Sequence, residues 1–194
     1  MDPILKKRVI IYNAPVILTY TIVALIILIV GLVTDNRTTY ALFSVYRGSW
    51  AQPLTYFRLF SHILGHSSVQ HYVNNFMYIL LIGPAVEERY GSRNLLIMIL
   101  TTALVIGLVN VFLFPGTALL GASGIVFMLI VLGSATNYSH GQIPLTMVMI
   151  ALIYIGNEVY KGITQQDTIS QLAHIIGGIM GIIFVLIMPK YRKS

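Results

Sequence analysis

Ser123 and His174 are the two residues of this sequence whose types and surroundings best suit covalent chemistry. A serine hydroxyl becomes a nucleophile when a neighbouring base takes its proton, and histidine is the usual base. Ser123 stands in the small-residue stretch Gly121-Ala122-Ser123-Gly124. His174 precedes Gly177, Gly178 and Gly181, whose offsets put them on one helical face. Because small residues let helices approach closely in lipid, we expect two close-packed helices that carry a Ser-His pair.

His71 and Asn75 form a second polar pair, four residues apart. On a helix both side chains project from one face. Acyl transfer needs hydrogen-bond donors for the developing oxyanion, and an imidazole, a side-chain amide and the backbone N–H of Ser123 would supply them. The chain has six acidic residues, and the nearest to His174, Glu158 and Asp167, fall in or beside a predicted loop. We therefore expect a dyad without a third acidic member.

The composition indicates the elements that must position these residues. The chain of 194 residues is 57% hydrophobic and 9% charged, whereas soluble domains are about 25% charged. A mean hydropathy of +0.83 agrees with this contrast. With no cysteine, disulfide scaffolds, thiolate metal sites and cysteine nucleophiles are excluded. The sequence thus predicts an all-α polytopic membrane protein.

Stretches without Asp, Glu, Lys or Arg bound the predicted spans, since a span needs about 20 residues. Four such stretches cover 9–34, 59–86, 94–157 and 168–189, and two clusters of breaker residues divide the longest into three. We read 35–67 as a loop at the membrane interface because it is rich in aromatic residues. The whole chain, 1–194, is then one membrane domain with six transmembrane helices, predicted at about 15–34, 68–88, 94–114, 121–136, 143–160 and 169–188.

The distribution of basic residues predicts the orientation. Eight of the twelve lie on the side of the two termini and four on the other, so the positive-inside rule puts both termini in the cytoplasm. His71, Ser123 and His174 then all lie within about two turns of the outer end of their helices. The net charge of +6 is accounted for as an orientation signal, and we expect no nucleic-acid partner.

Several motifs resemble those of the rhomboid family of intramembrane serine proteases. The stretch 121–124 resembles the family's GxSG motif, and 173–181 resembles its AHxxGxxxG motif. His71-Tyr72-Val73-Asn74-Asn75 is similar to HxxxN, and Glu87-Glu88-Arg89-Tyr90-Gly91 is similar to ExRxG. His62 and His66, after Phe57-Arg58, resemble the end of the family's first loop. The resemblance covers about residues 56–181, with the motifs in family order.

The resemblance implies a rhomboid-like bundle and a role for each matched residue. Ser123 would be the nucleophile, His174 the general base, and His71 and Asn75 the oxyanion partners. Phe127 stands where many members have a tyrosine that stacks on the histidine, and Phe57 stands where a tryptophan is common. We expect supporting roles for Phe127 and for the glycines at 121, 124, 177 and 181. The implied activity is cleavage of transmembrane proteins near the outer membrane boundary, without metal or cofactor.

Other interpretations stay open at the level of sequence. A catalytically silent relative that binds membrane clients would share this architecture, and the glycine faces would equally suit dimerisation. A transporter would show repeated halves, which we do not find. His62, His66 and His71 would suggest a metal site, but no HExxH motif accompanies them. We expect a multi-pass protein of a bacterial plasma membrane, and the oligomeric state is left undetermined.

Overall fold

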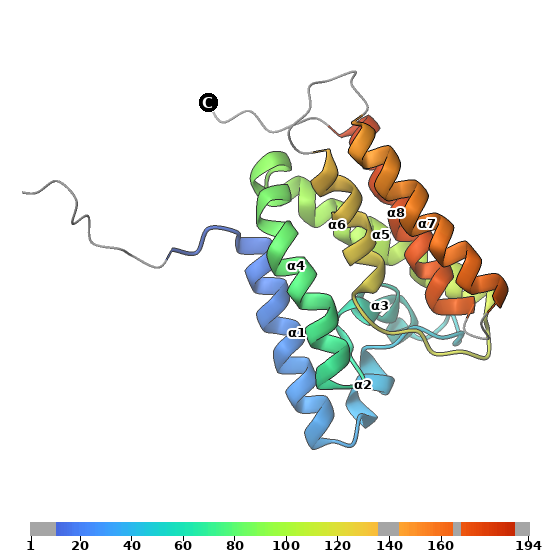
Figure 1. Cartoon of the computed structure of the whole chain (residues 1–194). Coiled ribbons are helices and arrows are strands. Elements are labelled where there is room, and N and C mark those ends of the chain that lie inside the picture. Colours follow the sequence, from blue (N-terminus) through green and yellow to red (C-terminus); the bar gives the residue numbers. More distant parts are fainter. Residues whose placement is uncertain (1–10, 136–143, 165–167, 189–194) are drawn as a thin grey trace, which may run out of the picture.

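A computed structural model describes residues 11–135, 144–164 and 168–188 of the chain, and these ranges are all-helical. A long helix occupies each of the six predicted ranges: α1 (Pro15–Val33), α4 (Val69–Tyr90), α5 (Ser92–Leu113), α6 (Ser123–Ser134), α7 (Leu145–Thr164) and α8 (Thr168–Ile187). Within the described residues, α1 and α5 meet the length and apolarity expected of a membrane span, whereas the whole of α6 and the Gln171–Ile187 part of α8 are shorter apolar helices. Figure 1 shows α6 between α4 and the α7/α8 pair.

The long segment between α1 and α4 is also helical, which the sequence analysis did not predict. It contains α2 (Arg37–Leu42), α3 (Pro53–Ser61) and a short 3-10 helix, η1 (His62–Leu64). Proline in the first turn begins α3, where its missing N–H costs nothing. Arg58 is buried, donates to the carbonyl of Ala41 and lies 4.3 Å from the Tyr46 ring centroid. These contacts hold α3 against the rest of the loop.

Glu87 joins the start of α1 to the end of α4. Its carboxylate accepts 3.0 Å hydrogen bonds from the backbone N–H groups of Val16 and Ile17, and a 2.7 Å bond from the Ser92 hydroxyl. The first N–H groups of a helix lack partners within the helix and attract negative charge. Glu87 thus caps α1 from another helix.

The closest helix packing in the bundle is between α6 and α8. A Cβ atom on Gly177 would collide with the backbone carbonyl of Gly124. On Gly181 it would lie 2.9 Å from the Met128 carbonyl oxygen, and on Gly124 it would lie 3.2 Å from that of Ala173. Glycine at these three positions therefore lets the backbones of α6 and α8 approach closely.

Candidate active site

Ser123 is the first residue of α6 and is half-buried. The preceding turn depends on Gly121, whose φ of +121° disfavours any residue with a Cβ atom. The Gly121 N–H donates to the carbonyl oxygen of His62 across 3.0 Å. This bond ties the start of α6 to η1, so the loop between α1 and α4 fixes the backbone that carries Ser123.

His174 lies near the start of α8 and is half-buried as well. Its ring stacks on Phe127 with centroids 4.4 Å apart and planes 8° from parallel. Ser123 and Phe127 are spaced i, i+4 and so share a face of α6. The stacking therefore brings the His174 ring to the face of α6 that begins with Ser123. The predicted pairing of phenylalanine with this histidine is present.

The His71 ring lies over the turn before Ser123. A Cβ atom on Gly121 would be 2.7 Å from Nε2 of His71, so only glycine leaves room for the ring. The other ring nitrogen, Nδ1, is 3.4 Å from the Ser67 hydroxyl. His71 is also close enough to His174 for the two rings to interact electrostatically. His71 thus faces the same small region as Ser123 and His174.

Asn75 is buried one turn further along α4. Its amide nitrogen donates to the backbone carbonyl of His71 across 3.0 Å. An amide nitrogen has two hydrogens, so one donor is used within the helix. The structure therefore gives Asn75 a clear contact with the backbone of His71, and its predicted contact with an oxyanion depends on the second hydrogen.

His62 and His66 are buried behind these residues and hydrogen-bond to backbone carbonyls. Nε2 of His62 lies 3.0 Å from the Ala103 carbonyl oxygen, and Nδ1 of His66 lies 3.2 Å from that of Leu64. Because a carbonyl only accepts, these ring nitrogens carry the hydrogen. Burial lowers the pKa of the His62 ring to about 4, and burial together with the neighbouring His71 lowers the pKa of the His66 ring to about 4. Both rings therefore stay neutral near pH 7 and act as hydrogen-bond donors to the backbone.

The contact between His66 and His71 was not expected from sequence. The two rings meet edge to face, with centroids 4.9 Å apart. His66 also packs against Tyr72 and Phe76, at 5.6 and 5.5 Å between centroids. Such aromatic pairs favour one orientation of each ring. His66 lies before α4 and His71 lies within it. Helical spacing therefore did not predict their contact.

Asn110 is a second residue that sequence reasoning missed. Its amide nitrogen donates to the carbonyls of Val45 and Thr117, at 3.0 and 3.1 Å. Val45 in turn forms an isolated antiparallel bridge with Leu119. Asn110 thus joins the first loop to the segment that leads into Ser123. A polar residue in a long apolar helix was the available signal.

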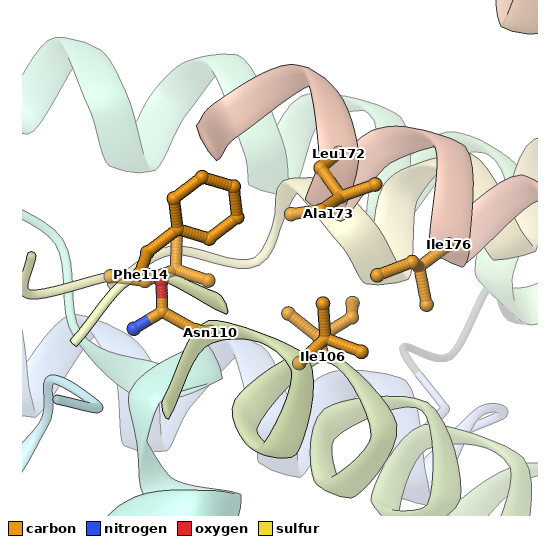
Figure 2. A pocket seen from close by; sticks show the side chains of 8 residues that line it. Ile106, Asn110, Phe114, Leu172, Ala173 and Ile176 are labelled. Carbon is orange, nitrogen blue, oxygen red and sulfur yellow. The ribbon is translucent and has the colours of Figure 1, made fainter. Parts of the chain in front are cut away.

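A small cavity lies between Asn110 on α5 and the first turns of α8 (Figure 2). Its volume is about 10 Å³, near the space that one water requires. Figure 2 shows Asn110 and Phe114 at one side and Leu172, Ala173 and Ile176 of α8 opposite. The carbonyl oxygen of the Asn110 side chain is buried without a hydrogen-bond partner. The cavity is too small to hold a peptide, so it is not the substrate cleft.

Comparisons with known proteins identify a family and several relatives. The family model described as the rhomboid domain matches residues 53–191. Rhomboid protease GlpG of Pectobacterium atrosepticum is 29% identical over 147 residues, which are 74% of this chain and 52% of that protein. Rhomboid-like protein 11, chloroplastic, of Arabidopsis thaliana is 27% identical over 144 residues, 66% of this chain and 51% of that protein.

A shorter relative is matched over more of its length. Rhomboid protease GlpG of Haemophilus influenzae is 27% identical over 143 residues, which are 71% of this chain and 72% of that protein. By contrast, this chain spans about half the length of the Pectobacterium and Arabidopsis relatives. The rhomboid domain nevertheless covers well over half of the chain. The chain therefore belongs to the rhomboid family, whose members are integral membrane proteins.

Proposed function

We propose that this protein is an intramembrane serine endopeptidase that uses a Ser123–His174 dyad. The observation that carries the proposal is the packing of α6 on α8, with the His174 ring stacked on the face of α6 that begins with Ser123. The names of the bacterial relatives, which are rhomboid proteases, support the same reaction class. The proposal includes one membrane domain of six spans with both termini in the cytoplasm, in a bacterial plasma membrane.

The proposed reaction begins when His174 takes the hydroxyl proton of Ser123. The serine oxygen then bonds to the carbonyl carbon of a peptide bond in a transmembrane substrate. His174 returns the proton to the leaving amine as the C–N bond breaks, which leaves an acyl-enzyme. In the second half of the reaction, His174 takes a proton from water, and the water oxygen bonds to the carbonyl carbon of the acyl-enzyme. The ester bond to Ser123 then breaks, His174 returns the proton to the Ser123 oxygen, and the acid product leaves. General acid–base catalysis of this kind contributes roughly 10²–10⁴-fold.

The oxyanion of each step needs donors that are already in position. The backbone N–H of Ser123 lies in the first turn of α6, where such groups lack partners within the helix. The His71 ring, held over Gly121, faces the same region. We assign these two groups as donors, with Asn75 as a third through its free amide hydrogen. Removing one such donor typically costs about 10²–10³-fold in kcat.

The substrate class follows from where the site lies along the helices. Ser123, His71 and His174 are each close to the end of α6, α4 and α8 that the proposed topology turns outward. A peptide bond therefore reaches Ser123 near the outer membrane boundary. Water reaches the acyl-enzyme from the same side. The proposed substrates are transmembrane proteins cut at that depth, without a metal or an organic cofactor.

Labelling with a fluorophosphonate tests the dyad without any knowledge of the substrate. We expect the wild type to label at Ser123 and Ser123→Ala to remain unlabelled. His174→Ala should label at least about a hundredfold more slowly, because the base is lost. Ser134→Ala is the matched control, since Ser134 ends the same helix and bonds to the Val131 carbonyl.

The client-binding alternative makes the opposite prediction for the same experiment. A folded wild-type protein that does not label at Ser123, in a bilayer where serine hydrolases of known activity do label, would favour a silent relative. Labelling that persists in Ser123→Ala would assign the reactive serine elsewhere.

A further inference from the structure

A second hollow lies away from Ser123, between α1 and α5. Its volume is about 510 Å³. Val23 on α1 faces Leu96 and Leu100 on α5, and Phe57 and Phe60 of α3 close one end. These five side chains are between 38% and 49% exposed, so they are accessible from the surface. The hollow, here called the α1/α5 groove, is therefore open to whatever surrounds the protein.

The groove presents mainly hydrocarbon, and the hydrogens of its few hydroxyl groups are already used within the protein. Four hydroxyl-bearing residues line it, and each hydroxyl makes a hydrogen bond within the protein: Tyr20 to the Ile63 carbonyl at 2.8 Å, Ser61 to the Leu42 carbonyl at 2.7 Å, Thr19 with the Tyr12 hydroxyl at 2.8 Å, and Ser92 to Glu87 at 2.7 Å. The hydroxyl hydrogens are therefore already used within the protein, and the rest of the lining is hydrocarbon. We expect an apolar occupant.

The dimensions of the groove fit an acyl chain rather than a helix. It extends from Pro15 to Val23 along α1 and from Ser92 to Leu100 along α5, about 12 Å at the helical rise of 1.5 Å. One leaflet has a hydrocarbon depth of about 15 Å. A spanning helix is about 10 Å wide and 30 Å long, roughly 2,400 Å³, several times the groove volume. The groove therefore accommodates one lipid chain within a single leaflet.

The two ends of the groove differ, which orients the chain. At one end α3 and η1 form a roof of Phe57, Phe60 and Leu64. At the other end Ser92 also lines an adjoining groove of about 940 Å³, which contains Arg93 and Asn94 together with Glu87, Glu88 and several apolar side chains. Arg93 is exposed, and a cation at the membrane surface attracts anionic lipid. An acyl chain in the groove would therefore end beneath α3, with its phosphate beside Arg93.

We propose that the α1/α5 groove binds one acyl chain of an anionic phospholipid, with its headgroup at Arg93. The assignment to the cytoplasmic leaflet rests on the proposed topology, whereas binding itself does not depend on proteolysis. The bound chain supports α3 and η1 from below. Because the His62 carbonyl of η1 holds the Gly121 N–H, the lipid also stabilises the turn that carries Ser123.

The test is native mass spectrometry of protein extracted from vesicles of equal parts phosphatidylglycerol and phosphatidylcholine. We expect the wild type to retain one phosphatidylglycerol. Val23→Trp and, from the facing wall, Leu96→Trp fill the groove and should lower retention about tenfold, like the loss of one well-buried chain segment. Ile26→Trp is the matched control on α1, because Ile26 is exposed but does not line the groove.

The headgroup is tested by charge removal. Arg93→Gln should lower the preference for phosphatidylglycerol over phosphatidylcholine roughly fivefold, the value of one basic residue near an anionic surface. Arg47→Gln, an exposed arginine in the first loop, should leave the preference unchanged. An unchanged preference in Arg93→Gln would overturn the headgroup site.

Other outcomes overturn the groove assignment itself. These are a wild type that retains no lipid, or equal retention by Val23→Trp and Ile26→Trp. If Val23→Trp kept its lipid but blocked cleavage of a transmembrane substrate, the groove would belong to the substrate instead. The same measurement on Ser123→Ala protein does not require activity, so a failure of lipid binding is distinct from a failure of the proposed protease function.

Discussion

The helix pairs α6/α8 and α1/α5 are both apolar, yet they pack in opposite ways. Between α6 and α8, Gly124 meets Gly177 with no room for a Cβ atom. Between α1 and α5, the larger side chains of Val23 and Leu100 border a groove of about 510 Å³. The candidate dyad lies on the first pair, and the proposed lipid site lies on the second.

The difference follows from how helices associate in lipid. Acyl chains are as apolar as leucine, so burial of apolar side chains provides little drive for association. Glycine permits close backbone approach and many dispersion contacts, which fix two helices relative to each other. Bulky residues without complementary holes leave space that lipid fills. The protein thus has a rigid contact between α6 and α8, here called the α6/α8 seam, where the side chains of Ser123 and His174 must meet. The contact between α1 and α5 is looser.

Gly177→Val is the substitution that breaks the α6/α8 seam most directly. Its side chain would collide with the backbone carbonyl of Gly124, which has no rotamer to change. We expect destabilisation of about 3 kcal/mol or more, at the upper end for overpacking, together with loss of labelling at Ser123. Thermal unfolding in detergent measures the first effect.

Gly156→Val is the control for this change, because a Cβ atom at Gly156 on α7 meets nothing within 4 Å. We expect its midpoint of unfolding to stay near that of the wild type. Equal destabilisation by the two variants would mean that the seam is not the tighter contact.

Gly121→Ala separates the geometry of the site from the stability of the seam. The new methyl group would lie 2.7 Å from Nε2 of His71 and would require a φ of +121°. We expect His71 to shift and kcat to fall about a hundredfold, as for loss of one oxyanion donor. KM should change little, and the midpoint of unfolding should fall less than in Gly177→Val. A hundredfold rise in KM at unchanged kcat would contradict the role of His71.

The pH dependence of stability tests His62, which links the first loop to Ala103 and, through its carbonyl, to Gly121. Burial holds its folded pKa at about 4 against 6.5 for the exposed ring. Below pH 6.5 the His62 ring therefore binds a proton in the unfolded chain but stays neutral in the folded protein. Between pH 6.5 and about pH 5 the free energy of unfolding should fall by about 1–2 kcal/mol from His62 alone.

His62→Gln is the matched variant, since glutamine still offers an N–H to the Ala103 carbonyl but does not titrate. In this variant the free energy of unfolding should no longer show the part of its pH dependence that comes from His62. The part that comes from His66 should remain. Urea titrations at several pH values measure both proteins. An identical slope in His62→Gln would mean that His62 titrates normally in the folded state.

Phe127→Ala should have the smallest effect on labelling at Ser123, and it tests whether stacking on Phe127 positions His174. It removes the ring that stacks on His174 at 4.4 Å. An aromatic pair contributes about 0.5–1.5 kcal/mol, so labelling at Ser123 should slow by roughly two- to tenfold. Phe127→Tyr keeps the stack and should label at the wild-type rate. A Tyr variant as slow as the Ala variant would contradict the stacking role.

The helices could be predicted from the sequence because charge and breaker residues mark their ends. The start of α6 differs: the prediction was 121, whereas the helix begins at Ser123. Gly121 adopts a left-handed φ and is held by the His62 carbonyl. That bond joins residues far apart in sequence, so local propensity does not reveal it. For the same reason the loop at 35–67 was not divided into α2, α3 and η1.

Those residues of the candidate site that follow helical spacing could be predicted from the sequence. The glycines after His174 and the His71–Asn75 pair carried that signal. The supports behind the site did not, because His62, His66 and Asn110 act through backbone carbonyls. Any residue type provides such an acceptor. Only the three-dimensional path of the chain shows which carbonyl each polar side chain meets.

The central claim is that Ser123 and His174 form a dyad on the α6/α8 seam. Its most direct test is cleavage of a transmembrane protein substrate in liposomes by wild type, Ser123→Ala and His174→Ala, each shown to be folded. We predict that the wild type cleaves the substrate near its outer boundary and that neither variant does. Equal cleavage by all three proteins would contradict the claim and would point to a contaminating protease.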